Sequence, residues 1–473
     1  MSQTITIDPV TRLEGHGKIT IMLNGQGEVE DAHFHVTQVR GFERFSEGRP
    51  FYEMPSLMAR ICGICPVSHL LASAKACEAI MSVRIPHTAA QLRRMLNLAQ
   101  MVQSHALSFF YLASPDLLLG MESDPKVRHI LGVAAAKPEL GRAGVALRRF
   151  GQTIIEILGD KRVHPGWVVP GGVTEPLSAA KRDRILSMIP EAYANVGLAI
   201  GAYKKIAGKF KDEIEVFANF PTNYMSLIGD DESIEFTDGA ARLIDGAGKT
   251  IEDGITAPRY TEVIGEAVEP YSYTKFAYYK PLGYPEGSYR VGPLARLNIV
   301  KSMGTPKAEK ELAEFKQLAK GPVESSFHYH HARLVEMLHG VEKIEEILAD
   351  PRILEKQVRA TAGVNRLEGA GFAEAPRGVL HHHYKVDENG KMVWANLVIA
   401  TGQNNKAMNL GVLQAAKHYV KNGKFTEGIL NRVEAVVRTF DPCLSCSSHA
   451  AGQMPLEISL LSPEGEVLDR AVR

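Results

Sequence analysis

Two pairs of cysteines have the spacing of metal ligands, one pair near each end of the 473-residue chain. Cys62 and Cys65 form the first Cys-x-x-Cys motif, and Cys443 and Cys446 form the second. Four thiolates suit zinc, iron–sulfur or nickel better than magnesium or calcium. Two unrelated pairs, or a structural zinc site, are the alternatives. Because a structural zinc site normally ties together nearby segments, the wide separation favours a site around which the whole chain folds.

The fifth cysteine, two histidine runs and one glycine-rich loop are weaker candidates. Cys77 lies in an Ala-rich run, so we expect a small buried side chain. The histidines within 328–331 and 381–383 could bind metal. However, successive strand residues point to opposite faces, so we predict structural or hydrogen-bonding roles for both runs. Residues 246–250 imitate a phosphate loop, but Leu243 stands where the motif requires glycine, which argues against nucleotide binding.

Composition and charge restrict the class of protein. The chain has 54 basic and 54 acidic residues, a balance that argues against nucleic-acid binding. Its hydrophobic fraction of 45% and charged fraction of 23% are those of a globular protein. Five cysteines are too few for a disulfide scaffold and favour a reducing compartment. The chain opens with no leader pattern, and the uncharged stretch from Met95 to Pro115 is too polar for a membrane span. We therefore expect a protein of the cytoplasm.

The elements that position these residues are predicted to be mostly helical. Apolar spacing predicts helices in these segments: 59–83, 89–112, 179–218, 306–319, 326–349, 406–421 and 426–438. Pro190 should start or kink a helix. Alternating patterns predict β-hairpins over 16–36 and 379–400. No repeat or low-complexity linker divides the chain. We predict one α+β domain over 1–473, predominantly helical, with a long buried helix bundle and peripheral β-hairpins.

Several motifs together carry a resemblance to a known enzyme family. They are D-P-V-T-R-L-E-G-H-G (8–17), R-G-F-E-R-F (40–45), R-I-C-G-I-C-P-V-S-H (60–69), E-A-P-R-G (374–378) and D-P-C-L-S-C-S-S-H (441–449). The chain resembles the large, catalytic subunit of [NiFe]-hydrogenases over essentially its full length. It looks most like the cytoplasmic, bidirectional, NAD-linked branch, although deazaflavin-reducing and viologen-reducing relatives share many of these features. A related quinone-binding respiratory subunit is disfavoured, because that relative has lost the cysteines.

The resemblance implies a nickel–iron centre. Cys62 and Cys443 would be terminal nickel ligands. Cys65 and Cys446 would bridge nickel to an iron that also carries one carbon monoxide and two cyanides. The implied reaction is the reversible heterolytic cleavage of dihydrogen, in which a proton passes from the Cys443 sulfur to Glu14.

The same resemblance assigns residues around the centre. Arg377 matches an arginine that lies over the metals, and Pro376 beside it matches an apolar wall. Asp116 and Asp441 match carboxylates that hold this arginine, a pairing that suits the fork of a guanidinium. His69 matches a histidine that donates to a bridging sulfur and thereby tunes the metal.

A second metal, partner subunits and processing also follow from the resemblance. Glu43 and His449 would bind Mg²⁺ near the C-terminus. With only Cys77 left over, electrons would pass first to an iron–sulfur small subunit, then to a diaphorase module with FMN and an NAD site. After nickel-insertion factors act, a maturation endopeptidase would cut behind His449 and remove residues 450–473.

Overall fold

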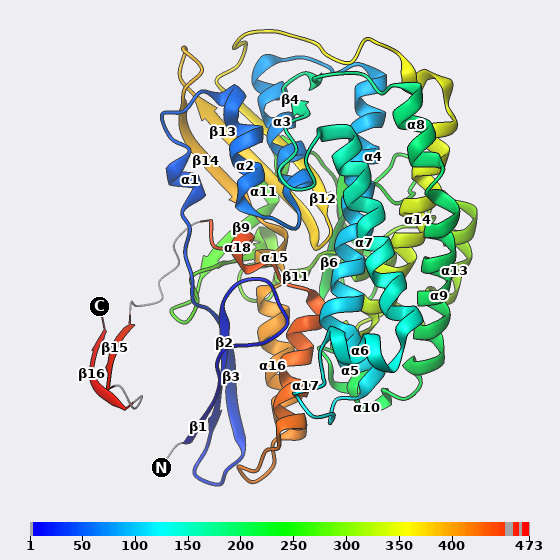
Figure 1. The fold of residues 1–473 in the computed structure, drawn as a ribbon. Coiled ribbons are helices and arrows are strands. Elements are labelled where there is room, and N and C mark those ends of the chain that lie inside the picture. The colour runs from blue at the N-terminus through cyan, green and yellow to red at the C-terminus, as the bar shows by residue number, and fades with distance from the viewer. Residues whose placement is uncertain (1–2, 450–456, 463–465, 473) are drawn as a thin grey trace.

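The described part of this computed structural model comprises residues 3–449, 457–462 and 466–472. Helices account for about 48% of the chain and strands for about 21%, so the predicted α+β class with predominant helix is confirmed. Figure 1 shows the long helices gathered on one side of the molecule, with the sheets at its other side and lower edge.

Long helices pack into one bundle, in which α3 follows the first cysteine motif. The packed group consists of α3 (Pro66–Met81), α4 (His87–Ala106), α7 (Pro138–Gly159), α9 (Ile189–Ala207) and α14 (Tyr329–Ala349). Helix α4 is buried almost all round and continues through a π-helical turn into α5 (Ser114–Leu119). The uncharged stretch identified in the sequence is therefore interior helix.

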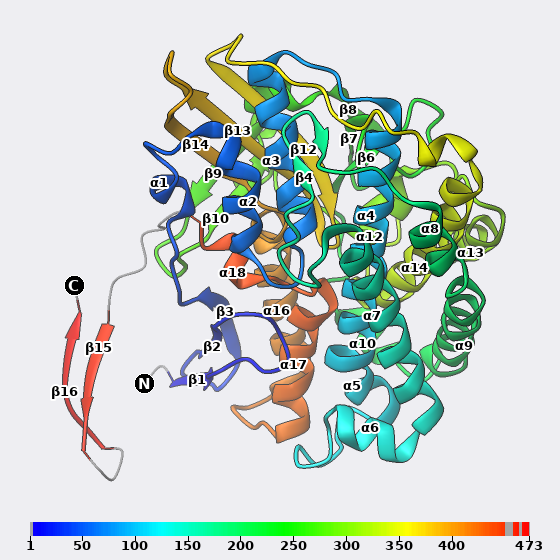
Figure 2. The ribbon, with the colours of Figure 1, turned by 45° about the horizontal axis from the view of Figure 1, so that its top comes forward.

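The remaining helices are shorter or cover the lower and outer faces. They are α1 (Phe42–Phe45), α2 (Met54–Met58), α6 (Ile130–Ala136), α8 (Ala179–Leu186), α10 (Lys211–Val216), α11 (Tyr260–Val263), α12 (Pro293–Ile299), α13 (Pro306–Lys316), α15 (Ala400–Gln403), α16 (Asn405–Tyr419), α17 (Glu427–Phe440) and α18 (Leu444–Ser447). In both ribbon views α16 and α17 lie side by side below the centre, and α17 leads directly into the second cysteine motif (Figures 1 and 2).

The strands form small sheets at the periphery. Antiparallel sheets join β1 (Gln3–Ile7), β2 (Gly17–Leu23) and β3 (Val29–Val36), and also β12 (Glu368–Ala375), β13 (Gly378–Val386) and β14 (Met392–Val398). A mixed sheet has the order β11 (Tyr289–Arg290), β6 (Asn223–Ile228), β7 (Ala240–Ile244) and β8 (Thr250–Ile255). Two-stranded ribbons pair β4 (Val168–Val169) with β5 (Gly172–Val173), β9 (Ile264–Val268) with β10 (Lys275–Tyr279), and β15 (Glu457–Leu461) with β16 (Val467–Val472). Both predicted hairpins are confirmed, as β2–β3 and β13–β14. Each pairs with a third strand, β1 in the first sheet and β12 in the second.

One long helix, α7, was not predicted from the sequence, because glycines interrupt its apolar pattern. Gly144 faces Phe110, where an added Cβ would lie 2.6 Å from the Phe110 Cβ. At Gly151 an added Cβ would lie 2.2 Å from the Ala99 carbonyl oxygen. The glycines thus lower helix propensity but permit close packing on α4 and its continuation. The segment 179–218 is three helices rather than one, and α9 begins at Ile189 with proline in its first turn.

Among the described residues, one helical stretch, 179–207, is long and apolar enough to cross a membrane. About a third of its most apolar window is buried in the protein. A core helix passes the same test, so this feature by itself is weak evidence for a membrane span.

Candidate metal centre

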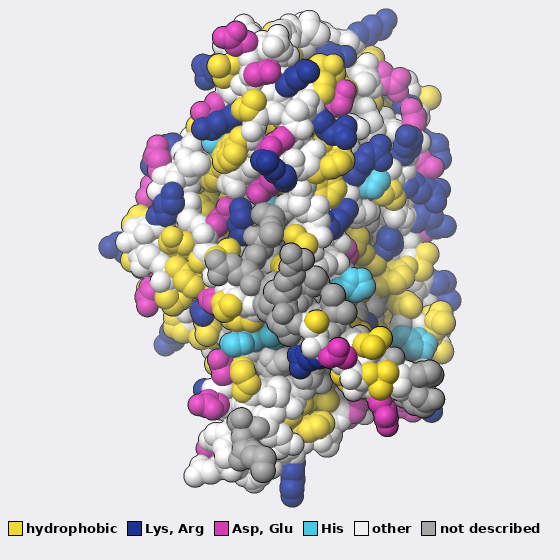
Figure 3. Space-filling view, turned by 90° about the vertical axis from the view of Figure 1, so that its left-hand side faces the viewer, with side chains coloured by type: hydrophobic (Ala, Val, Ile, Leu, Met, Phe, Trp, Pro, Cys, Tyr) yellow, Lys and Arg dark blue, Asp and Glu magenta, His cyan; other side chains and the backbone are white. Residues whose placement is uncertain are grey.

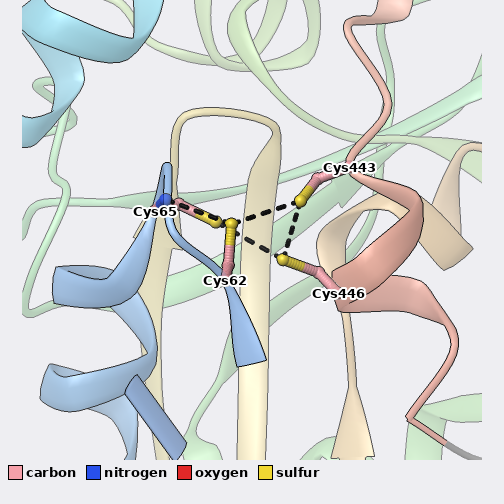
Figure 4. A group of neighbouring side chains, drawn as sticks. All are labelled: Cys62, Cys65, Cys443 and Cys446. Atoms are coloured by element: carbon pink, nitrogen blue, oxygen red, sulfur yellow. Dashed lines mark hydrogen bonds between the residues drawn. The ribbon is translucent and has the colours of Figure 1, made fainter. Parts of the chain in front are cut away.

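The four cysteines of the two motifs converge at one buried point. We call Cys62 and Cys65 the N-terminal pair, and Cys443 and Cys446 the C-terminal pair. The Sγ atoms of Cys62 and Cys443 are 3.3 Å apart, and those of Cys65 and Cys446 are 3.5 Å apart. All four sulfurs lie within 4.8 Å of one another, and no side chain is more than 3% exposed. Figure 4 shows the four side chains pointing toward a common centre. The site joins segments 381 residues apart in the chain.

The backbone holds each pair at the start of a helix. Cys65 is the N-cap of α3, and Pro66 is the first residue of this helix. Proline suits that position because it has no N–H group, and an N–H there would find no acceptor within the helix. α17 ends at Asp441 in the left-handed conformation, which turns the chain back toward the centre. The Cys443 N–H donates to Thr401 Oγ1 over 3.0 Å. All five cysteines are free, so no disulfide helps to hold the motifs in place. The backbone contacts described above position both motifs.

The electrostatics of the cluster favour a bound cation. Burial raises the pKa of Cys443 and of Cys446 well above the ordinary thiol value. Hydrogen bonds from Cys443 and the other neighbouring thiols lower the pKa of Cys65. Four adjacent buried thiolates repel one another, so a soft metal ion is needed to stabilise them. The donor set therefore fits a thiolate-bound nickel–iron or zinc centre.

Glu14 reaches the cluster from the loop between β1 and β2. Its Oε2 lies 2.9 Å from Cys443 Sγ and accepts the Ser445 N–H over 3.1 Å. The Ser445 hydroxyl donates to the other carboxylate oxygen. The Leu444 N–H donates to the Glu14 carbonyl over 3.0 Å, so backbone and side chain are both fixed. The structure therefore brings this predicted residue into contact with one cysteine of the C-terminal pair.

Arg377 is buried beside the C-terminal motif. Its guanidinium binds the Asp441 carboxylate over 3.0 Å and donates to the Asp441 carbonyl. Arg296 holds the turn that carries Arg377, because it donates to the carbonyls of Ala375 and Pro376, each over 3.1 Å. The sequence predicted no role for Arg296. Its buried partners Glu336 and Glu374 come from distant elements that only the fold brings together.

The prediction that Asp116 holds Arg377 is wrong in this structure. Asp116 Oδ1 binds Arg12 over 2.6 Å, and Oδ2 binds Arg438 over 2.5 Å. Asn431 also donates to Oδ1, so both oxygens have partners. Arg12 lies two residues before Glu14, in the left-handed conformation. Asp116 is thus a buried anchor for the loop that carries Glu14.

His69 and a second group of candidate ligands lie on the other side of the C-terminal pair. His69 Nε2 is 3.4 Å from Cys446 Sγ. His449 Nε2 lies 3.6 Å from Glu43 Oε1 and has no hydrogen-bond partner among the described residues. Burial raises the pKa of Glu43 to about 7 and lowers the pKa of His449 to about 3. A neutral buried imidazole nitrogen directed at a carboxylate oxygen fits a divalent cation between them.

The polar groups around this second candidate site were not predicted from the sequence. Lys275 Nζ lies 3.6 Å from Glu43 Oε1 and 3.2 Å from the half-buried carboxylate of Glu266. It also lies 3.4 Å from Asn396 Oδ1. These residues come from β9, β10 and β14, and no motif in the sequence marks them. The ammonium group offsets negative charge that a divalent cation would otherwise neutralise alone.

The weaker sequence candidates lie outside the cluster. Cys77 is fully buried, its thiol donates to the Phe51 carbonyl over 3.1 Å, and burial raises its pKa. In the described part of the chain, the four cysteines are the one group of three or more such ligands found close enough to bind a metal. Neither histidine run belongs to such a group. Residues 246–249 lie in the turn between β7 and β8, and Thr250 begins β8.

Comparisons with known proteins agree with this site. The family model for nickel-dependent hydrogenases matches residues 40–124 and 219–449, and a HoxL-like model matches residues 4–39. The chain is 42% identical to the beta subunit of the NAD-reducing hydrogenase HoxS of Cupriavidus necator, over 100% of both chains. It is 39% identical to one subunit of the F420-non-reducing hydrogenase vhc of Methanococcus voltae, over 96% of this chain and 97% of the relative.

Solved structures give the same result. An NAD⁺-reducing [NiFe]-hydrogenase in the H₂-reduced state has a TM-score of 0.92 at 42% identity, covering 94% of this chain and 99% of that one. A [NiFeSe] hydrogenase of Desulfovibrio vulgaris Hildenborough has a TM-score of 0.76 at 25% identity, covering 95% and 100%. The chain belongs to the nickel-dependent hydrogenase family. Within that family it is the large, catalytic subunit of a [NiFe]-hydrogenase, and it cleaves dihydrogen.

Proposed function

We propose that the cysteine cluster holds the nickel–iron centre of an NAD-reducing hydrogenase. Cys62, Cys65, Cys443 and Cys446 would hold the two metals, and carbon monoxide and cyanide would complete the ligands of the iron. The observation that carries this proposal is the convergence of four buried thiols within 4.8 Å. Such a centre supplies a Lewis acid that polarises dihydrogen, and the protein supplies the groups that receive the proton.

In this proposal Glu14 carries the proton away from Cys443. Its Oε2 is 2.9 Å from the sulfur, within reach of direct proton transfer. Ser445 donates to both carboxylate oxygens, so the carboxylate faces the sulfur in a fixed orientation. The ion pair between Arg12 and the buried Asp116 anchors the loop that carries Glu14.

Arg377, Asp441 and Pro376 form the wall opposite the proton acceptor. A permanently charged guanidinium can donate to cyanide nitrogens, and Asp441 keeps it in place. Arg296 fixes the turn through backbone carbonyls. This wall is a rigid positioning surface rather than a source or acceptor of protons.

The second site, at Glu43 and His449, is proposed to bind Mg²⁺. Its support is the buried Nε2 of His449, which lies 3.6 Å from the Glu43 carboxylate and has no hydrogen-bond partner in the described part of the chain. His449 is three residues from Cys446, so an ion there ties the end of the C-terminal motif to α1. The ammonium group of Lys275 lies 3.6 Å from Glu43 Oε1 and would offset part of the charge with which this carboxylate attracts a divalent cation.

Electrons from dihydrogen need carriers outside this chain. With four of five cysteines in the centre, the chain has too few left for an iron–sulfur cluster. We propose that the direct partner is an iron–sulfur small subunit, and that a diaphorase module with FMN reduces NAD, in the cytoplasm. Val39, Phe45 and Tyr52, close in sequence to the N-terminal pair, are 47%, 53% and 61% exposed. Figure 3 shows hydrophobic side chains interspersed with charged ones on the left-hand face of Figure 1, and we propose that the partner binds there.

The segment behind His449 is proposed to be a maturation extension. Nickel-insertion factors would load the open site, and an endopeptidase would then remove residues 450–473. The described parts of this segment, 457–462 and 466–472, contain the β15–β16 hairpin. Intact-mass measurement of the active complex tests the proposal. A large-subunit mass that still includes Arg473, together with full nickel and full activity, would contradict cleavage.

The decisive experiment for the proposed function is a pair of measurements on the natively purified complex. Metal analysis should give nickel and iron together, and dihydrogen should reduce NAD. Nickel and iron with viologen reduction but no NAD reduction would favour the F420-non-reducing type, to which the chain is 36–40% identical. Zinc alone would instead indicate a non-enzymatic scaffold.

A further inference from the structure

Helix α9 has an apolar face that no part of the described chain covers. Its other face is buried, and the helix packs there on α7 and α14. The uncovered face exposes Ala194, Gly197 and Leu198, while Gly201 and Ala202 are partly covered. Leu198 is 39% exposed, and in both ribbon views α9 lies at the right-hand edge of the molecule (Figures 1 and 2). The helix therefore has a second side on which another apolar surface could pack.

The glycines of this face leave room for a close neighbour. A Cβ added at Gly197 or at Gly201 would find open space within 4 Å, whereas Gly144 and Gly151 of α7 lie directly against other parts of the chain. A cavity of about 460 Å³ lies beside the two α9 glycines, and the start of α7 forms its other wall. Glycine weakens a helix interior relative to alanine, but it allows a second backbone to approach closely. The face thus has the shape of a groove that fits a helix.

Opposite charges stand at the two ends of the same face. Glu191 lies seven residues before Leu198, and Lys205 lies seven residues after it, so all three are near one side of the helix. Both charged side chains are exposed, and neither forms an ion pair within the described residues. Lys204, next in sequence, instead pairs with two glutamates of α13. An apolar centre is thus flanked by one unpaired acidic and one unpaired basic side chain.

We propose that α9 pairs with α9 of a second copy of this chain, antiparallel and about a two-fold axis at Leu198. In such a pair, Glu191 of each copy faces Lys205 of the other, so both contacts join opposite charges. A parallel pair would bring Glu191 against Glu191 and Lys205 against Lys205, which like-charge repulsion disfavours. The charges therefore select the antiparallel orientation, and the two-fold axis limits the assembly to two copies.

A second copy fits this face better than a lipid surface does. The two charges lie about 21 Å apart along the helix axis, and anionic headgroups would attract Lys205 but repel Glu191. The surface proposed above for the small subunit includes α1, which lies on the left-hand side of Figure 1, away from α9. Both contacts can therefore form in one complex, which would then contain two metal centres. Pairing through α9 goes beyond the proposed function and requires no hydrogenase activity.

The first test counts the large subunits in each particle of the natively purified complex. Sedimentation velocity is measured from nanomolar to high micromolar concentrations, and native mass spectrometry gives the composition. We expect particles with two large subunits, which separate on dilution. Leu198→Glu places two carboxylates at the two-fold axis and should abolish them. Particles with one large subunit at every concentration would overturn the proposal. So would particles with two large subunits that Leu198→Glu leaves intact, because another contact would then hold them together.

The second test reverses the charges and thereby examines the orientation. Glu191→Lys and Lys205→Glu each create two like-charge contacts and should raise the dissociation constant of the dimer at least about tenfold. The double variant exchanges the two charges and should restore most of the lost affinity. Glu388→Lys, exposed in the turn between β13 and β14, is the matched control and should change nothing. All these side chains are exposed, so the variants should fold, which thermal unfolding and an unchanged turnover per large subunit check.

The charge variants also have outcomes that contradict the proposal. A double variant that recovers no affinity would exclude the antiparallel pair. Single variants that behave like Glu388→Lys would exclude pairing through α9 altogether.

A third test distinguishes a second copy from other occupants of the face. Leu198→Cys introduces an exposed cysteine into a chain whose five native cysteines are buried. Mild oxidation should link two large subunits through it, because residues at a two-fold axis meet their own copies. If this cysteine is protected from a soluble thiol reagent in particles with one large subunit, a different subunit covers the face. If such particles float with anionic vesicles and Leu198→Glu abolishes flotation, the face binds lipid. Either result would overturn the proposal and leave the assignment of the metal centre unaffected.

Discussion

The two cysteine pairs have the same spacing, but their surroundings differ. In the N-terminal pair, Cys62 Sγ accepts N–H groups from its own motif, those of Ile64 over 3.2 Å and of the residue after it over 3.3 Å. The sulfurs of the C-terminal pair instead contact side chains from elsewhere, Glu14 at 2.9 Å and His69 at 3.4 Å. The first pair is preorganised by local backbone, and the second is connected to titratable groups.

This difference suggests a division of labour within one metal centre. Backbone N–H groups stabilise a thiolate without exchanging protons at neutral pH. A carboxylate and an imidazole can exchange or direct protons. The N-terminal pair is thus suited to holding metal, while the C-terminal pair both holds metal and handles the proton. Substitutions can separate the two tasks.

Metal binding should depend equally on both pairs, and its loss is the largest effect we expect. Replacing Cys62 or Cys443 with serine exchanges a soft thiolate for a hard, barely acidic hydroxyl. We expect nickel content and dihydrogen oxidation both to be lost in Cys62→Ser and in Cys443→Ser, as measured by elemental analysis and by the rate of dye reduction. Cys77→Ser, outside the cluster, is the control and should retain nickel. Normal nickel in either of the first two variants would contradict the four-thiolate site.

Proton transfer should depend on the C-terminal pair alone. Glu14→Gln keeps the size and some of the hydrogen bonding of the side chain but removes its titratable group. We expect nickel content to stay normal and turnover to fall by about 10²–10⁴-fold, the usual contribution of general acid–base catalysis. Glu30→Gln, an exposed carboxylate on β3, is the matched control. Near-normal turnover in Glu14→Gln would show that another group carries the proton.

The loop of Glu14 should depend on the buried anchor Asp116. Asp116→Asn removes the negative charge that Arg12 and Arg438 share, while Arg438 keeps its ion pair with Glu434. Breaking a buried ion pair in this way typically costs about 3–5 kcal/mol of stability. Denaturant unfolding measures the change. Asp160→Asn is the control, because Asp160 is exposed and its left-handed conformation suits asparagine.

Unchanged stability in Asp116→Asn would show that the ion-pair cluster contributes nothing to holding the loop. Lower stability together with lower turnover would instead link the anchor to Glu14, as the geometry requires.

Local motifs predicted the centre well, because each motif carries its own chemistry. The cysteine spacings, the helix after Pro66 and the hairpin over 379–400 all depend on residues close in sequence. The helix α17, which ends just before Cys443, was also predicted to within two residues at its C-terminal end. The contact of Glu14 with Cys443 was expected from the resemblance, and the structure shows the contact but not the role.

Long-range partners of charged residues could not be predicted. Asp116 was assigned to Arg377, but the fold brings Arg12 and Arg438 closer to it, and an acidic residue has no local signal that selects among arginines. Lys275, at the candidate magnesium site, was missed for the same reason. The contact between His69 and His382 was not predicted, because the two residues meet only when α3 packs on β13.

The smallest effect that distinguishes the two pairs concerns the hydroxyl of Ser445. It donates to Glu14, while the Ser445 backbone N–H donates to the same carboxylate over 3.1 Å. Ser445→Ala removes one of these two donors from a half-buried carboxylate that water can still reach. A single hydrogen bond contributes about 0.5–1.5 kcal/mol net, so turnover should fall by roughly 2- to 12-fold, with nickel content unchanged. Ser447→Ala is the matched control, because its hydroxyl donates only to the Leu444 carbonyl and should leave turnover as it is.

A loss in Ser445→Ala as large as that in Glu14→Gln would mean that the hydroxyl itself passes the proton onward. The C-terminal pair would then connect to solvent through the serine, and the carboxylate would be only the first step.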